Sequence, residues 1–135
     1  MRVLLDTNVV LDFILKRPPF DIDAKEILVC AARKQITVYV SPITPINAFY
    51  KTRKEKGKGI AFQAIEKLLK IVHIAKSNNT IYQNALSINF NDYEDAVQHE
   101  CAVAENLDAM VTRNVKDYKN AVLKVYSPTE FLQVI

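Results

Sequence analysis

Short apolar runs that stop abruptly at polar residues, separated by stretches of helical periodicity, limit the fold of this chain more than any other feature. The run at residues 2–5 stops at Asp6, and the run at residues 109–111 stops at the polar segment that begins with Thr112. Apolar runs this short are typical of strands that are buried on both faces. Strands are expected at residues 2–5, 36–40, 71–74, 109–111 and 123–126.

Helices are expected between these strands, because polar capping residues are followed by apolar residues at helical spacing. The expected N-caps are Thr7 or Asn8, Asp23, Thr44 (before Pro45), and Asn91 or Asp92. Alternating strands and helices imply a parallel sheet with helices on both faces. We therefore expect a three-layer α/β/α fold with a central parallel sheet of four to five short strands.

Length and composition favour one self-sufficient domain. A chain of 135 residues, half of them hydrophobic, fits a single domain over residues 1–135 with its own core. Cys30 and Cys101 lie in apolar, helix-like stretches and suggest buried thiols in a reducing compartment. Asp6 and Asp12 interrupt the N-terminal apolar stretch, which disfavours a signal peptide, and no apolar run is long enough to span a membrane. The expected location is the cytoplasm.

Charge is distributed unevenly along the chain. Residues 51–76 contain eight Lys or Arg and two Glu, a net charge of +6, whereas residues 77–135 contain four basic and eight acidic residues, a net charge of −4. The basic segment is compatible with a surface that binds a polyanion, and equally with an ordinary solvated helix face. The sequence leaves these two interpretations open.

Four aspartates are expected at the edge of the sheet where ligands usually bind. Asp6 ends the first strand, Asp92 and Asp95 open a helix, and Asp117 follows the strand at 109–111. Taken singly, each has a structural explanation as a cap or turn residue. Together they are more typical of a site for a hard cation such as Mg²⁺ or Mn²⁺, which prefers oxygen ligands. Asp6 is the strongest candidate, because a charge directly after a buried strand must be compensated.

The segments Leu-Asp-Thr-Asn at residues 5–8, Asp-Tyr-Glu-Asp at 92–95 and Thr-Arg-Asn-x-x-Asp-Tyr at 112–118 together resemble the PIN-domain family. The resemblance covers nearly the whole chain. It implies a Mg²⁺- or Mn²⁺-dependent ribonuclease, often a VapC-type toxin that is dimeric and neutralised by a small antitoxin. By position, it implies that Asp6, Asp95 and Asp117 are catalytic metal ligands, with Asp92 as an optional further ligand.

The resemblance also assigns supporting roles and one departure. Asn8, Thr112 and Asn114 match polar residues that support the acidic site through hydrogen bonds. Most members of the family have a glutamate where this chain has Asn47, which is neutral and could coordinate only through its amide oxygen or hold a water. The cluster is thereby one negative charge short, which makes metal binding a safer prediction than turnover.

An acidic site that acts on RNA needs positive charge nearby. The candidate nucleic-acid-binding residues are Lys51, Arg53, Lys54 and Arg113. Tyr50 and Tyr93 could stack on unpaired bases, although packing is the more ordinary role for both. His99 lies one helical turn after Asp95 and could act as a general acid, but a hydrogen-bonded structural histidine explains it better.

Three functions therefore compete. The first is a metal-dependent endoribonuclease, the toxin of a toxin–antitoxin pair, with RNA as its substrate, a homodimer as its form and no membrane association. The second is a catalytically weak or inactive RNA- or protein-binding module, for which Asn47 would be the signature. The third is a phosphatase with Asp6 as nucleophile, which Asn8 disfavours because such enzymes usually have a second aspartate at that position.

Overall fold

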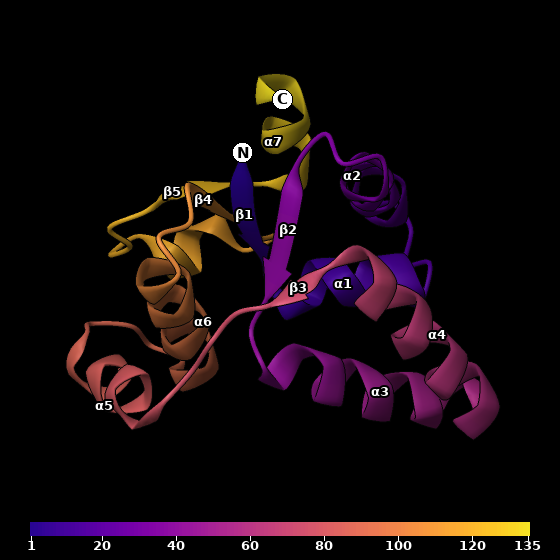
Figure 1. Cartoon of the computed structure of the whole chain (residues 1–135), viewed down its shortest axis with the longest axis horizontal. Helices are drawn as coiled ribbons and strands as arrows, with labels where there is room; N and C mark the ends of the chain where they lie inside the picture. The colour runs from indigo at the N-terminus through magenta and orange to yellow at the C-terminus, as the bar shows by residue number, and fades with distance from the viewer.

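The computed structural model describes residues 1–135 as a five-stranded parallel sheet with helices on both faces (Figure 1). The strands are β1 (Arg2–Leu5), β2 (Thr37–Val40), β3 (His73–Ile74), β4 (Ala109–Val111) and β5 (Lys124–Tyr126). The helices are α1 (Thr7–Ile14), α2 (Asp21–Ala32), α3 (Ile43–Lys56), α4 (Lys58–Ile71), α5 (Asn79–Ser87), α6 (Tyr93–Ala104) and α7 (Pro128–Val134), with a 3₁₀ helix η1 (Val115–Tyr118). The expected three-layer α/β/α fold is confirmed.

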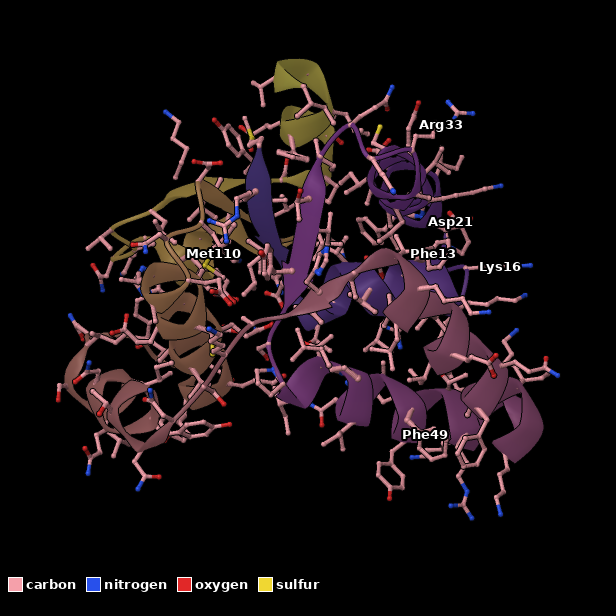
Figure 2. All side chains as sticks on the ribbon, viewed as in Figure 1. Phe13, Lys16, Asp21, Arg33, Phe49 and Met110 are labelled. Atoms are coloured by element: carbon pink, nitrogen blue, oxygen red, sulfur yellow. The ribbon has the colours of Figure 1, made fainter.

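The order of the strands is β3-β2-β1-β4-β5, so the most apolar strands, β1 and β4, lie at the centre. Alternate residues of β1 face opposite sides of the sheet, as the pleat requires. Val3 and Leu5 join the core under α1, α2 and α7, whereas Leu4 joins the core under α5 and α6. Met110 of β4 lies on this second side, in the region between the sheet and α6 (Figure 2).

The expected strands at residues 2–5 and 109–111 are confirmed at both ends, whereas the strand expected at 71–74 is reduced to His73–Ile74 at the sheet edge. Three expected caps are wrong. Asp6 caps α1 in place of Thr7 or Asn8. Helix α2 begins at Asp21 after Phe20, so Asp23 lies in its first turn, and α3 begins at Ile43 with Thr44 buried in its first turn. Asp92 caps α6 as expected.

Both cysteines are free thiols, Cys101 buried and Cys30 half-buried. Burial raises the pKa of the Cys101 thiol to about 11. None of the helices has the length and apolar character needed to span a bilayer.

Candidate active site

The candidate site lies at the carboxyl ends of β1 and β4. Between these two strands the order in which strands are added to the sheet reverses. From β1 the strand order proceeds to β2 and β3, and the chain then returns to place β4 on the other side of β1. The crevice at such a switch point is where open α/β sheets bind ligands. Asp6 directly follows β1, and its backbone N–H donates to the carbonyl oxygen of Val111, 2.9 Å away, so it remains locked to the end of β4.

The carboxylate of Asp6 is buried and accepts hydrogen bonds on both oxygens. Oδ2 accepts from the Thr112 hydroxyl at 2.8 Å and from the Tyr118 hydroxyl at 3.0 Å. Oδ1 accepts from the Asn8 backbone N–H and from Gln98 Nε2, both at 3.3 Å. The bond from the Asn8 N–H makes Asp6 the N-cap of α1, so a local structural role accounts for part of the need for a carboxylate here. Capping needs only one of its two oxygens.

Tyr118 joins Asp6 to Asp95. Its hydroxyl oxygen lies 3.0 Å from Asp6 Oδ2 and 3.2 Å from Asp95 Oδ1, and it accepts a hydrogen bond from Gln98 Nε2 at 3.2 Å. A phenol has one hydrogen, so it can donate to only one of the two carboxylates at a time. The carboxylate that does not receive this hydrogen can lie this close to the phenol oxygen only if it carries a proton of its own or binds a cation.

Asp95 shows the electrostatic consequence of this arrangement. Its pKa is raised to about 7, chiefly by burial and then by the negative charges of Asp6, Asp92 and Asp117, while the hydrogen bond from Tyr118 lowers it. Asp6, Asp92 and Asp117 are thus each close enough to Asp95 to raise its pKa. A cation bound among them would relieve their mutual repulsion.

Asp92 and Asp117 are both exposed, in contrast to Asp6. The carboxylate of Asp92 accepts from the backbone N–H of Asp95 at 3.0 Å, so it caps α6. Asp117 is carried by η1, whose backbone closes a turn on Asn114. Asp92 therefore has a structural task already, whereas the Asp117 side chain has no partner in the protein.

The residues of the crevice fit a hard divalent cation by the chemistry of their donors, which are carboxylate, hydroxyl and amide oxygens. No group of three or more Asp, Glu, His or Cys side chains is close enough to bind a metal ion without rearrangement.

The supporting residues named from the sequence surround Thr112. The Thr112 hydroxyl accepts from Asn8 Nδ2 at 3.4 Å and from the Asn114 backbone N–H at 3.1 Å, and donates to Asp6. Asn8 Oδ1 accepts from the Arg113 backbone N–H at 3.4 Å. These contacts tie the start of α1 to the loop after β4.

Asn47 takes no part in this group of hydrogen bonds. Its amide Nδ2 donates to Glu94 Oε1 at 3.1 Å. The side chain that was considered as an oxygen ligand therefore presents its nitrogen to another acidic residue.

Arg113 does not face the crevice as a free cation. Its Nε lies 2.8 Å from Oδ2 of the buried Asp12, and its guanidinium covers the ring of Phe20, 4.2 Å from the centroid. By contrast, Lys51, Arg53 and Lys54 are exposed on α3. Helical spacing puts Lys51 and Lys54 on the same face as Asn47, one and two turns further along, and puts Arg53 on a different face.

His99 is buried and both of its ring nitrogens are occupied by groups outside the acidic cluster. Nδ1 contacts Glu100 Oε2 at 2.8 Å, and Nε2 accepts from the Val122 backbone N–H at 3.1 Å. The ring also packs on Phe90, with centroids 5.1 Å apart. These contacts describe a structural histidine and give no support to a general-acid role.

The two tyrosines considered for base stacking are both partly free. Tyr50 is 60% exposed and packs edge-on against Phe49, whereas the Tyr93 hydroxyl donates to the Tyr82 carbonyl. Tyr50 lies one turn after Asn47 and is therefore the better placed of the two to contact a ligand in the crevice.

A comparison with protein families decides how this arrangement should be classified. The profile of the PIN domain matches residues 2–116, which is most of the chain. The chain belongs to the PIN domain family. No curated protein is similar enough in sequence to count as a match.

Solved structures share the fold of this PIN domain at low sequence identity. VapBC2 from Rickettsia felis, bound to a DNA fragment from its promoter, is 22% identical, with 93% of this chain and 97% of that chain covered and a TM-score of 0.71. VapBC-1 from nontypeable Haemophilus influenzae is 21% identical, with 96% and 99% covered and a TM-score of 0.68. VapC20 of Mycobacterium tuberculosis, a toxin that cleaves the sarcin-ricin loop, is 13% identical, with 80% and 86% covered and a TM-score of 0.64.

The role of Gln98 in the site of this PIN domain was not predicted from the sequence. Gln98 is fully buried and contacts three elements: its Oε1 accepts from the Thr7 backbone N–H, and its Nε2 donates to Asp6 and Tyr118. Its signal was present, because Gln98 interrupts the buried apolar stripe of α6. A buried amide that satisfies three partners fixes their relative positions, and its loss would leave each without one.

Proposed function

We propose that this PIN domain is a Mg²⁺- or Mn²⁺-dependent endoribonuclease that acts in the cytoplasm as the toxin of a toxin–antitoxin pair. The observation that carries the proposal is the approach of Asp6 and Asp95 through one Tyr118 hydroxyl at the switch point of the sheet. Two carboxylates that share one phenolic hydrogen carry negative charge that this contact does not neutralise. Asp117, which has no protein partner, is available at the rim of the same crevice.

Asp6, Asp95 and Asp117 would hold the cation, with Asp92 as an optional further ligand. A bound Mg²⁺ or Mn²⁺ would lower the pKa of a water molecule and stabilise the negative charge that grows on the scissile phosphate. The protein's own contribution is to hold Asp6 in place: Thr112 and Tyr118 donate to the same oxygen, so its carboxylate is oriented before a ligand arrives.

RNA would approach along α3. Lys51 and Lys54 are exposed on the helix face that leads away from Asn47, and they would neutralise backbone phosphates on either side of the cleaved bond. Tyr50, on the same side of the helix, could stack on an unpaired base. Arg53 would add charge from the neighbouring face. We leave Arg113 out of this surface, because its guanidinium is paired with Asp12.

Cleavage of RNA by the purified full-length chain tests the proposal. We expect single-stranded or structured RNA to be cut in Mg²⁺ or Mn²⁺, with activity abolished by EDTA and restored by excess metal. Fragments would be mapped on a denaturing gel. Absence of cleavage across varied RNAs in both metals, together with retained RNA binding in a gel-shift assay, would favour the inactive binding module instead.

An antitoxin partner is the second part of the proposal, extended from the VapBC complexes that share the fold. An apolar groove of about 720 Å³ runs between α3 and α4 and is lined by Ile46, Phe49, Tyr50, Phe62, Ile65 and Leu69. Figure 2 shows Phe49 on α3, and its ring packs on the ring of Phe62 in α4 with the two centroids 4.8 Å apart. An exposed apolar groove between two helices suits the apolar face of an amphipathic segment.

Replacement of Phe62 with lysine is expected to abolish complex formation with the product of the neighbouring small open reading frame. Phe62 is 57% exposed in the groove, so the change should cost little folding stability while adding charge to the apolar surface. Co-purification and size-exclusion chromatography with light scattering would measure it. Leu86→Lys, at a 72% exposed leucine of α5, is the matched control. If Phe62→Lys converts a homodimer of the chain alone to a monomer, the groove is a dimer interface instead.

A further inference from the structure

Glu94 is a carboxylate of the crevice to which neither the sequence motifs nor the proposed function gives a role. It lies in the first turn of α6, directly before Asp95 and one turn before Gln98, and it is half-buried. No lysine, arginine or histidine lies within ion-pair distance of it. A partly buried carboxylate without a cation, beside other carboxylates, costs folding free energy unless something compensates it.

Two other helices hold Glu94 in this position. Asn47 Nδ2 of α3 donates to Oε1 at 3.1 Å, and the Thr7 hydroxyl at the start of α1 lies 3.4 Å from the same oxygen. The Thr7 hydroxyl also contacts the Thr44 hydroxyl at 2.8 Å, so Asn47 forms the stronger of the two hydrogen bonds to Glu94. Because both contacts are made to Oε1, Oε2 accepts no hydrogen bond from the protein.

The carboxylates are thereby held differently. Asp6 and Asp95 are both in contact with the Tyr118 hydroxyl. Glu94 has one carboxylate oxygen without a hydrogen bond, and its other oxygen is oriented by an amide from a different helix. An oriented carboxylate with a free oxygen is suited to receive a divalent cation or a water molecule bound to one.

We propose that Glu94 is a further acidic residue of the metal centre and that Asn47 is its positioning residue. The inference rests on the proposed function, since it assumes that the crevice binds a divalent cation. Under this assignment α3 contributes a hydrogen-bond donor, and α6 contributes the carboxylate that faces it. The neutral side chain at position 47 then does not leave the site short of charge, because its hydrogen-bond partner Glu94 supplies the carboxylate.

Binding of Mn²⁺ to the full-length protein, followed by the electron paramagnetic resonance of free Mn²⁺, tests the proposal without reference to activity. We expect Glu94→Gln, which keeps an oxygen for Asn47, to weaken the affinity by about 10-fold or more. Glu105→Gln at the end of the same helix is the matched control, because it removes the same charge and retains an acceptor for the Lys76 N–H. Its affinity should stay within about twofold of the parent protein.

A charge relocation makes the test sharper. The double variant Asn47→Glu/Glu94→Gln moves the carboxylate from α6 to α3 at nearly the same place, and we expect it to recover most of the lost affinity. Asn47→Ala, which leaves Glu94 present but not held, should weaken binding by a smaller factor. Thermal melts would establish that each variant is folded, and Asn47→Ala serves as the test if Glu94→Gln is not.

The outcomes separate this inference from the proposed function. If the parent protein binds Mn²⁺ and Asp6→Asn abolishes binding, while Glu94→Gln and Asn47→Ala bind as tightly as Glu105→Gln, then the metal centre stands and the role of Glu94 is wrong. If the parent protein binds neither Mn²⁺ nor Mg²⁺, both the metal centre and the role of Glu94 are wrong.

Discussion

Replacement of Asp6 with asparagine is expected to reduce RNA cleavage by at least about 10²–10³-fold while leaving the protein folded. Asp6 is the only acidic residue of the crevice that is almost completely buried, and it is oriented by four hydrogen bonds. The variant removes its negative charge, and with it the strongest ligand for a cation in this crevice. The amide also cannot replace both carboxylate oxygens, because one of its two polar atoms is a donor.

The fold should survive, because the hydrogen bonds around residue 6 can be rearranged. An asparagine with its oxygen toward Gln98 and the Asn8 N–H would aim its amide hydrogens at the hydroxyls of Thr112 and Tyr118. The Tyr118 oxygen has a lone pair left to accept, whereas the Thr112 oxygen can accept once its 3.4 Å hydrogen bond from Asn8 Nδ2 is released. The Tyr118 hydrogen would then be free to donate to Asp95. Removal of one charge also reduces the repulsion that raises the pKa of Asp95.

The measurement compares cleavage rates and urea unfolding of Asp6→Asn with those of Asp108→Asn. Asp108 directly precedes β4 and so lies at the amino ends of the strands, away from the candidate site. Its Oδ2 accepts from the Arg2 backbone N–H at 2.8 Å. Its variant should cleave at the parental rate. Undiminished cleavage by folded Asp6→Asn would show that the activity does not use this crevice.

Much of the fold could be read from the sequence, because the strands at the centre of the sheet are short apolar runs with polar neighbours. β1 and β4 were predicted at both ends, since each is buried on both faces and stops at the edge where water begins. β3 was overestimated because its apolar residues partly belong to the last turn of α4. Sequence periodicity does not distinguish these two neighbours.

The site was harder to predict than the fold, because its connections join residues that are distant in the sequence. The positions of the aspartates followed from the topology, but the hydroxyl that joins two of them comes from Tyr118, 112 residues after Asp6. The contact between Asn47 and Glu94 likewise crosses between two helices. Thr7 or Asn8 was expected to cap α1, and Asp6 caps it instead. Such pairings depend on how the helices pack, which local patterns do not encode.

Arg113→Ala is expected to lower the free energy of unfolding by about 3–5 kcal/mol at neutral pH, because it leaves the buried carboxylate of Asp12 without its cation. The Asp12 side chain is 1% exposed, and the Arg113 Nε at 2.8 Å is the closest cation. Neither Asp12 oxygen accepts a hydrogen bond of good geometry, so the pair is held by charge attraction alone. The stacking of the guanidinium on Phe20 would be lost as well.

The loss should become smaller as the pH falls. Burial raises the pKa of Asp12, with Asp21 adding to the rise, while Arg113 and Arg17 oppose it. Because the pKa is higher in the folded than in the unfolded state, the folded state binds the proton more tightly, and lowering the pH through the folded-state pKa stabilises it. Without Arg113 the folded-state pKa rises further. The deficit of the variant relative to the parent protein should therefore be smaller at pH 5 than at pH 7.5.

Urea unfolding at both pH values would measure this effect, with Arg33→Ala as the control. Arg33 follows the end of α2 and is exposed at the outer surface, as Figure 2 shows, so its variant should change stability by no more than about 0.5 kcal/mol at either pH. Asp12→Leu/Arg113→Met should recover much of the loss, since it removes both charges and keeps the volume filled. If Arg113→Ala matches Arg33→Ala at both pH values, Asp12 is compensated by another group, and Arg113 becomes available again as a residue that binds RNA.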